Sequence, residues 1–89
     1  MRFLSFFMRK QIEATNYIKS LLASRNLKIE SGIVMIAEEG WQVFDYNSKC
    51  IGIDPNSGVW IGPSGGDWES LGVCTVSSTL QAVEFLTKE

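Results

Sequence analysis

The chain has 89 residues, of which 45% are hydrophobic and 20% are charged. This length predicts a single domain, and the composition excludes intrinsically disordered and low-complexity classes. The chain contains no histidine, which excludes His-based catalytic triads and histidine-containing metal sites. We therefore expect one globular domain over residues 1–89 that is not an enzyme and needs no cofactor or metal.

Charge is divided unevenly along the chain. Residues 1–28 carry six basic side chains and one acidic one, whereas residues 29–89 carry two basic and nine acidic ones. Such a basic segment is typical either of an arm for nucleic acid or membranes, or of a solvated helix face beside an acidic sheet. We favour the helix face, because the net charge of −2 opposes binding to phosphate. The sequence therefore predicts neither a nucleic-acid nor a membrane partner.

Residues 3–24 are expected to form one amphipathic helix. Apolar side chains, among them Ala14, Ile18 and Leu22, gather on one arc at helical spacing, and polar side chains gather opposite. No Pro or Gly interrupts the segment, and Asn26 is expected to end it. The apolar stripe is broad, so we expect a partner or a second subunit to cover part of it.

From Gly32 the apolar period becomes that of strands. The expected strands are residues 33–37, 41–46, 49–53, 59–62 and 71–76. Turns are expected at Glu39-Gly40, at Asn47-Ser48 and over residues 54–58, where Gly58 would supply a positive φ. A capping box that begins at Ser78 predicts a C-terminal helix through Leu86.

This order of elements predicts an α+β fold. We expect a small, mainly antiparallel sheet of four or five strands, with both terminal helices packed on one face. If Ile53 pairs with Val59, Trp60 lies opposite Gly52 on the face that the helices leave uncovered.

Either Trp41 or Phe44 of the neighbouring strand is expected to join Trp60 on that uncovered face. Large aromatic side chains on an open sheet face are typical of an interface. A tryptophan that shields a bare glycine backbone is the alternative interpretation. The sequence alone leaves both open.

The segment of residues 64–69 raises a second possibility for function. Asp67 and Glu69 form a close carboxylate pair around Trp68, which is the set of side chains that a glycosidase or lectin uses. A chain this small offers little cleft to raise the pKa of a carboxyl group, so we disfavour catalysis and keep ligand or carbohydrate binding. Residues 62–66 are rich in glycine but lack the Gly-Lys-Ser/Thr ending of a phosphate-binding loop, so we do not expect a phosphate site there.

The two cysteines, Cys50 and Cys74, lie far apart in apolar strand patterns. They are too few for a disulfide scaffold and have no C-x-x-C spacing. We expect both to be reduced, buried side chains of a cytoplasmic protein.

The C-terminal half, residues 51–89, resembles the end of SUKH-type immunity proteins. The likeness rests on Ile51-Gly52-Ile53-Asp54, Gly58-Val59-Trp60 and the segment from Val76-Ser77-Ser78 to Phe85-Leu86. In that superfamily a hairpin of this pattern precedes a short Ser-led helix that ends in Phe-Leu. The first half lacks the Pro-led helix and Asn-Gly segment of the family. The resemblance implies a toxin-neutralising binder without catalysis, and no functional residue is carried over.

We therefore interpret the chain as a non-enzymatic protein-binding module, from a mobile or accessory gene set. The expected interaction surface is Trp41, Trp60, Trp68, Asp67 and Glu69. The partner is another protein or a second copy of the chain. Two alternatives stay open, a small ligand- or carbohydrate-binding protein that uses residues 64–69 and a homodimeric structural protein.

Overall fold

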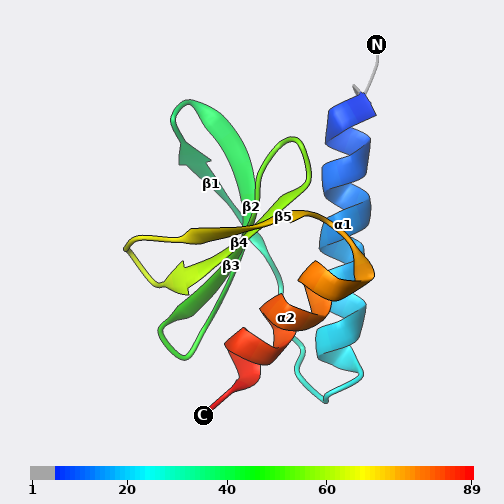
Figure 1. Cartoon of the computed structure of the whole chain (residues 1–89), viewed down its shortest axis with the longest axis vertical. Coiled ribbons are helices and arrows are strands. Elements are labelled where there is room, and N and C mark those ends of the chain that lie inside the picture. The colour runs from blue at the N-terminus through cyan, green and yellow to red at the C-terminus, as the bar shows by residue number, and fades with distance from the viewer. Residues whose placement is uncertain (1–5) are drawn as a thin grey trace.

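The computed structural model describes the backbone of residues 6–89 and the side chains from residue 9 onward. Within that part of the chain, two helices flank five strands in sequence (Figure 1). Helix α1 covers Phe6–Ala23 and helix α2 covers Val76–Thr87. The strands are β1 Gly32–Ile36, β2 Glu39–Tyr46, β3 Lys49–Ile53, β4 Gly58–Pro63 and β5 Glu69–Val73. Residues 3–5 of the expected first helix lie outside the described residues.

The five strands form one antiparallel sheet in which every strand lies beside its neighbour in sequence, in the order β1-β2-β3-β4-β5. Both helices lie on the same side of this sheet (Figure 1). The expected α+β architecture is thereby confirmed. No helix among residues 6–89 is long and apolar enough to cross a bilayer.

Two tight turns set the register of the first three strands. Ala37 and Glu38 take φ values of 51° and 65°, and Asn47 and Ser48 take 56° and 64°. Two consecutive residues of positive φ match the right-handed twist of the strands they join. The turn at Asn47-Ser48 is confirmed, but the expected turn at Glu39-Gly40 is wrong, because the chain already reverses at Ala37-Glu38 and Glu39 begins β2.

The third turn, between β3 and β4, depends on one carboxylate. Oδ1 of Asp54 accepts hydrogen bonds from the backbone N–H of Asn56 and Gly58, both at 2.8 Å, and Oδ2 accepts one from Nε1 of Trp60 at 2.9 Å. Ser57, with a φ of 67°, takes the left-handed conformation that was expected at Gly58. Gly58 is needed for a different reason, since the Asp54 carboxylate occupies the space of a Cβ there.

Helix α2 begins one turn earlier than expected, and its N-cap is Thr75 instead of Ser78. The Thr75 hydroxyl accepts the Ser78 N–H at 3.0 Å, and the Ser78 hydroxyl accepts the Thr75 N–H at 2.9 Å. This reciprocal pair is a capping box that satisfies two backbone donors. The expected last strand through Val76 is therefore wrong: β5 ends at Val73, shortly after Gly72 takes a φ of 86°.

The core lies between the two helices and one face of the sheet. It consists of Ala14, Ile18 and Leu22 of α1, Phe44, Ile51, Ile53 and Val59 of the sheet, and Ala82, Val83 and Leu86 of α2. Each of these side chains is at most 4% exposed, so the apolar arc expected for α1 is the face that packs inward. Asn26, with a φ of 65°, ends α1 as expected, and the Leu27 N–H bonds the Leu22 carbonyl at 3.0 Å.

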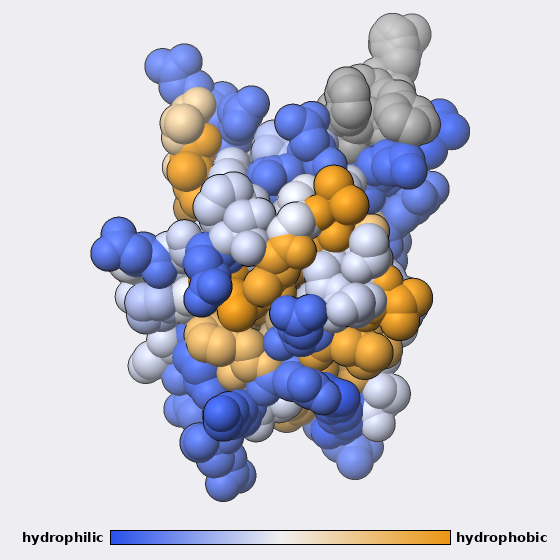
Figure 2. Space-filling view, in the orientation of Figure 1, coloured by the Kyte–Doolittle hydropathy of each residue, from blue (hydrophilic) through white to orange (hydrophobic). Residues whose placement is uncertain are grey.

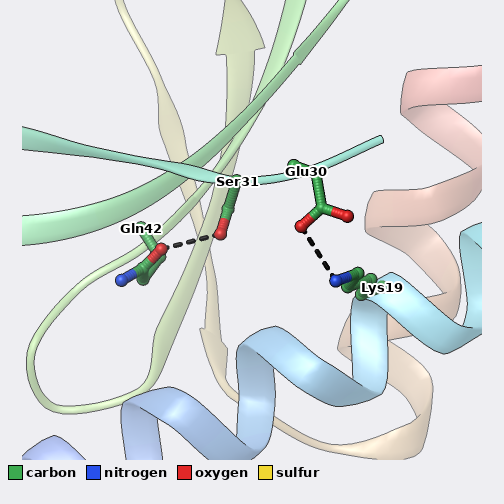
Figure 3. A network of polar contacts seen from close by, with 4 residues as sticks. All are labelled: Lys19, Glu30, Ser31 and Gln42. Carbon is green, nitrogen blue, oxygen red and sulfur yellow. Dashed lines mark hydrogen bonds and ion pairs between the residues drawn. The ribbon is translucent and has the colours of Figure 1, made fainter. Parts of the chain in front are cut away.

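Polar contacts fix α1 and its connection to the sheet. Lys19 of α1 forms an ion pair with Glu30 at 2.8 Å, and the next residue, Ser31, donates a hydrogen bond to Gln42 of β2 at 2.7 Å (Figure 3). Closer to the core, Nε2 of the buried Gln11 donates to the carbonyls of Gly40 and Ile53, both at 3.0 Å. One amide therefore joins α1 to both β2 and β3.

Replacement of Gln11 should destabilise the protein, because its amide joins α1 to two strands. We expect Gln11→Met, which keeps the volume but removes the donor, to lower the free energy of unfolding by about 2 kcal/mol, because two carbonyls lose their partner. Gln81→Met on the exposed face of α2 is the matched control and should change stability by less than about 0.5 kcal/mol. Urea denaturation measures both, and equal effects of the two changes would contradict the role of Gln11.

Candidate functional site

The sheet face opposite the helices carries a tryptophan cluster. The register confirms that Ile53 pairs with Val59, which places Trp60 opposite Gly52. Of the two aromatic residues considered for β2, Trp41 joins this face, and Phe44 is fully buried in the core on the other side.

Trp68 completes the cluster from the segment that leads into β5. A Cβ at Gly52 would lie 2.6 Å from Cζ3 of Trp68 and 3.2 Å from Cε3 of Trp41. At Gly62 of the adjacent strand, a Cβ would collide with the Trp68 ring and with the Asp67 carbonyl. Trp68 therefore lies directly on the bare backbone of two strands, and it is Trp68, not Trp60, that covers Gly52.

The three rings are held in a fixed arrangement. The Trp41 ring centroid lies 5.6 Å from that of Trp60 and 6.1 Å from that of Trp68, with interplanar angles of 56° and 53°. Tilted pairs at these distances are favourable aromatic contacts. Nε1 of Trp60 is bonded to Asp54, and Nε1 of Trp68 donates to the Pro63 carbonyl at 2.8 Å. Nε1 of Trp41 is buried and has no acceptor among the residues that the structure describes.

These rings form one wall of a groove of about 560 Å³, which we call the tryptophan groove. Apolar side chains of β1 and β2, Cys50 of β3 and two loop glycines also line it, together with two carboxylates, those of Asp45 and Asp67. Its lining residues are Val34, Ile36, Trp41, Val43, Asp45, Cys50, Trp60, Gly65, Gly66, Asp67 and Trp68. The groove therefore combines an apolar floor with negative charge.

The segment between β4 and β5 is tied down beside the groove. The Ser64 hydroxyl donates to Asp45 at 3.0 Å and its backbone N–H bonds the Ser48 carbonyl at 3.0 Å. The Gly66 N–H bonds the Pro63 carbonyl at 3.2 Å. These bonds hold the loop that carries Trp68 against the sheet.

The carboxylates of Asp67 and Glu69 do not share the groove. Asp67 lines it, whereas Glu69 begins β5 opposite Ile61, whose side chain packs toward the helices. Trp68, expected in an exposed loop between them, is half-buried on the sheet. The arrangement of two facing carboxylates that glycoside hydrolysis uses is therefore not formed by this pair.

Both cysteines are free thiols. Cys50 is buried, as expected, and its thiol lies 3.6 Å from the Ser64 hydroxyl. The expectation is wrong for Cys74, which is only partly buried because it lies where β5 passes into α2. Burial is the main cause that raises the pKa of each thiol above its usual value, which disfavours the nucleophilic thiolate.

No group of acidic or cysteine side chains within the described range, residues 6–89, is placed to hold a metal ion. The comparisons with known proteins add no assignment: no family model, no curated protein and no solved structure matches this chain.

The packing of Trp68 on bare backbone leads to a specific prediction. Gly52→Ala should destabilise the protein by about 3 kcal/mol, because the added methyl group enters the space of the Trp68 ring. Gly40→Ala, where the nearest neighbour of a Cβ lies at an ordinary 3.7 Å, is the matched control and should be close to neutral.

In a Trp68→Leu background, Gly52→Ala should lower the free energy of unfolding by only about 1 kcal/mol, because part of the clash is removed with the ring. Thermal and urea denaturation of the four proteins of this double-mutant cycle give the coupling. An equal cost of Gly52→Ala in both backgrounds would show that Trp68 does not rest on Gly52.

Proposed function

We propose that this protein is a non-enzymatic binding module and that the tryptophan groove receives a side chain of a protein partner. The observation that carries the proposal is the convergence of Trp41, Trp60 and Trp68 on the helix-free face of the sheet. Tryptophan is the residue type most enriched at the energetic centres of protein interfaces, where it offers a large area with few rotatable bonds.

The chemistry of the groove favours one class of partner. Its floor is apolar, and the carboxylates of Asp45 and Asp67 lie at its border. Both residues are exposed, so their charge is available at the surface. A partner with an apolar side chain next to Lys or Arg satisfies both features, since opposite charge across an interface steers and orients association.

The resemblance of residues 51–89 to SUKH-type immunity proteins favours the same class of function. It would make the partner a toxin protein and the gene a mobile or accessory one. The raised pKa of both thiols and the separation of Asp67 from Glu69 also favour a binding role over catalysis. We propose the cytoplasm as the location of this interaction.

A small ligand or carbohydrate is the second candidate occupant. Gly65, Gly66 and Asp67 line the groove, so the loop that suggested this function does contribute to it. The ring geometry is less favourable, because planes tilted by 53° and 56° do not form one flat stacking platform. We therefore rank the protein partner first.

The three indole N–H groups provide a direct test. In a ¹⁵N NMR titration, short capped peptides with a central Leu or Phe flanked by Arg should shift the indole signals of Trp41, Trp60 and Trp68. Acid-flanked peptides of the same length should not. Asp67→Lys should weaken binding about fivefold through loss of a surface charge pair. Glu84→Lys, the same charge change on the exposed face of α2, should leave it unchanged.

Three other outcomes of this titration would change or contradict the proposal. Indole shifts produced by oligosaccharides and not by peptides would replace the protein partner by the second candidate. If Asp67→Lys and Glu84→Lys weakened peptide binding equally, the peptides would be attracted by the net charge of the protein and not by the groove. Indole signals that respond to neither class of ligand would contradict the proposal.

A further inference from the structure

The Trp60 ring of the tryptophan groove is tied to a residue outside that groove. Its Nε1 donates a hydrogen bond to Oδ2 of Asp54, six positions earlier in the sequence, at 2.9 Å. Asp54 follows directly after β3 and is not one of the residues that line the groove. A hydrogen bond to a carboxylate is stronger than one between two neutral groups. The position of the Trp60 ring therefore depends on a side chain that does not itself line the groove.

The neighbouring strands do little to fix the Trp60 ring. Its partners across the sheet are Gly52 on β3, which has no side chain, and Ser70 on β5, which has a small one. The register between β4 and β5 shifts next to Trp60, so the ladder on that side is irregular. The Trp41 ring packs against it at a centroid distance of 5.6 Å. Asp54 supplies a constraint that the cross-strand neighbours do not.

The Asp54 carboxylate is itself held in place by the turn between β3 and β4. Its other oxygen, Oδ1, accepts the backbone N–H groups of Asn56 and Gly58, both at 2.8 Å. In the same turn the Asp54 N–H donates to the Gly58 carbonyl and the Asp54 carbonyl accepts the Ser57 N–H, both at 3.0 Å. The side chain is also half-buried. A carboxylate with these partners has little freedom, so it can hold the indole in one place.

The place of the Trp60 ring sets the width of the groove. Trp60 on β4 and the pair Val34 and Ile36 on β1 line the same groove, from strands three places apart in the sheet. Figure 2 shows apolar residues at the end of the sheet where Figure 1 places β1. Rotation of the Trp60 ring about its side-chain bonds would narrow or widen the space between them. A partner would then meet a groove of variable shape.

We propose that Asp54 is the positioning residue of the tryptophan groove and holds Trp60 in the orientation that a partner requires. This inference rests on the proposed function of the groove as the site that receives an apolar side chain. A ring that is fixed before association loses less freedom on binding, so preorganisation strengthens binding without a new contact. The bond also uses the Trp60 N–H, as the Pro63 carbonyl uses that of Trp68. These two rings therefore meet a partner through carbon atoms, which suits an apolar side chain.

Asp54→Asn separates the bond to Trp60 from the bonds within the turn. The remaining oxygen of the amide can still accept the N–H groups of Asn56 and Gly58, whereas its NH₂ group would face the Trp60 N–H, donor against donor. Asn is as suited as Asp to a turn of this kind, so the variant should fold. In the free protein, hydrogen exchange of the Trp60 indole should become about tenfold faster. The Trp68 indole has a different acceptor and is the internal control that should not change.

The same variant should bind the Arg-flanked Leu and Phe peptides about fivefold more weakly, because one hydrogen bond no longer fixes the ring. Glu84→Gln removes one negative charge from the exposed face of α2 and should change neither the indole exchange nor the affinity. In a Trp60→Phe background, which has no indole N–H at this position, Asp54→Asn should no longer weaken binding, because the two changes act on one bond.

Unchanged exchange of the Trp60 indole in Asp54→Asn, or faster exchange with unchanged peptide affinity, would overturn this role of Asp54. Equal weakening by Asp54→Asn in the wild-type and Trp60→Phe backgrounds would overturn it too, because the effect would then act through charge or through the turn. A wild type that binds none of the peptides would contradict the proposed function, whereas indole exchange in the free protein would still decide whether Asp54 holds the ring.

Discussion

The absence of a Cβ at two positions of the sheet is the constraint on which the rest of the candidate site depends. Gly52 and Gly62 leave a strip of bare backbone on β3 and β4, and the Trp68 ring fills the space that side chains would otherwise occupy. Once Trp68 lies there, the Trp41 ring packs against both the Trp68 ring and the Trp60 ring. A small domain thereby gains ordered apolar packing on the sheet face that its helices do not cover.

The two faces of the sheet consequently have different roles. One face holds the core, where Gln11 also joins α1 to two strands, and it accounts for most of the buried apolar side chains. The other face holds half-buried tryptophans beside an apolar groove with acidic residues at its border. The edge strand β1 contributes Val34 and Ile36 to this groove.

Sequence periodicity predicted the elements, the hairpin register and the face that carries Trp60, because alternation in β3 and β4 is regular. It misplaced the cap of α2, since Thr75 and Ser78 are both good N-cap residues and only tertiary packing distinguishes them. It also left the Trp68 side chain exposed, whereas that side chain is half-buried on the sheet. The pairing that placed Gly52 on the helix-free face also places Gly62 there, and two glycines on one face were the available signal that an aromatic ring covers them.

The most direct measurement is a nuclear Overhauser experiment on the free protein. We expect strong contacts between the ring protons of Trp68 and the α-protons of both Gly52 and Gly62, with these α-protons shifted by the ring current. Contacts should also join the rings of Trp41 and Trp60. A Trp68 ring without contacts to either glycine, together with ordinary glycine shifts, would contradict the claim that the tryptophan groove is built on bare backbone.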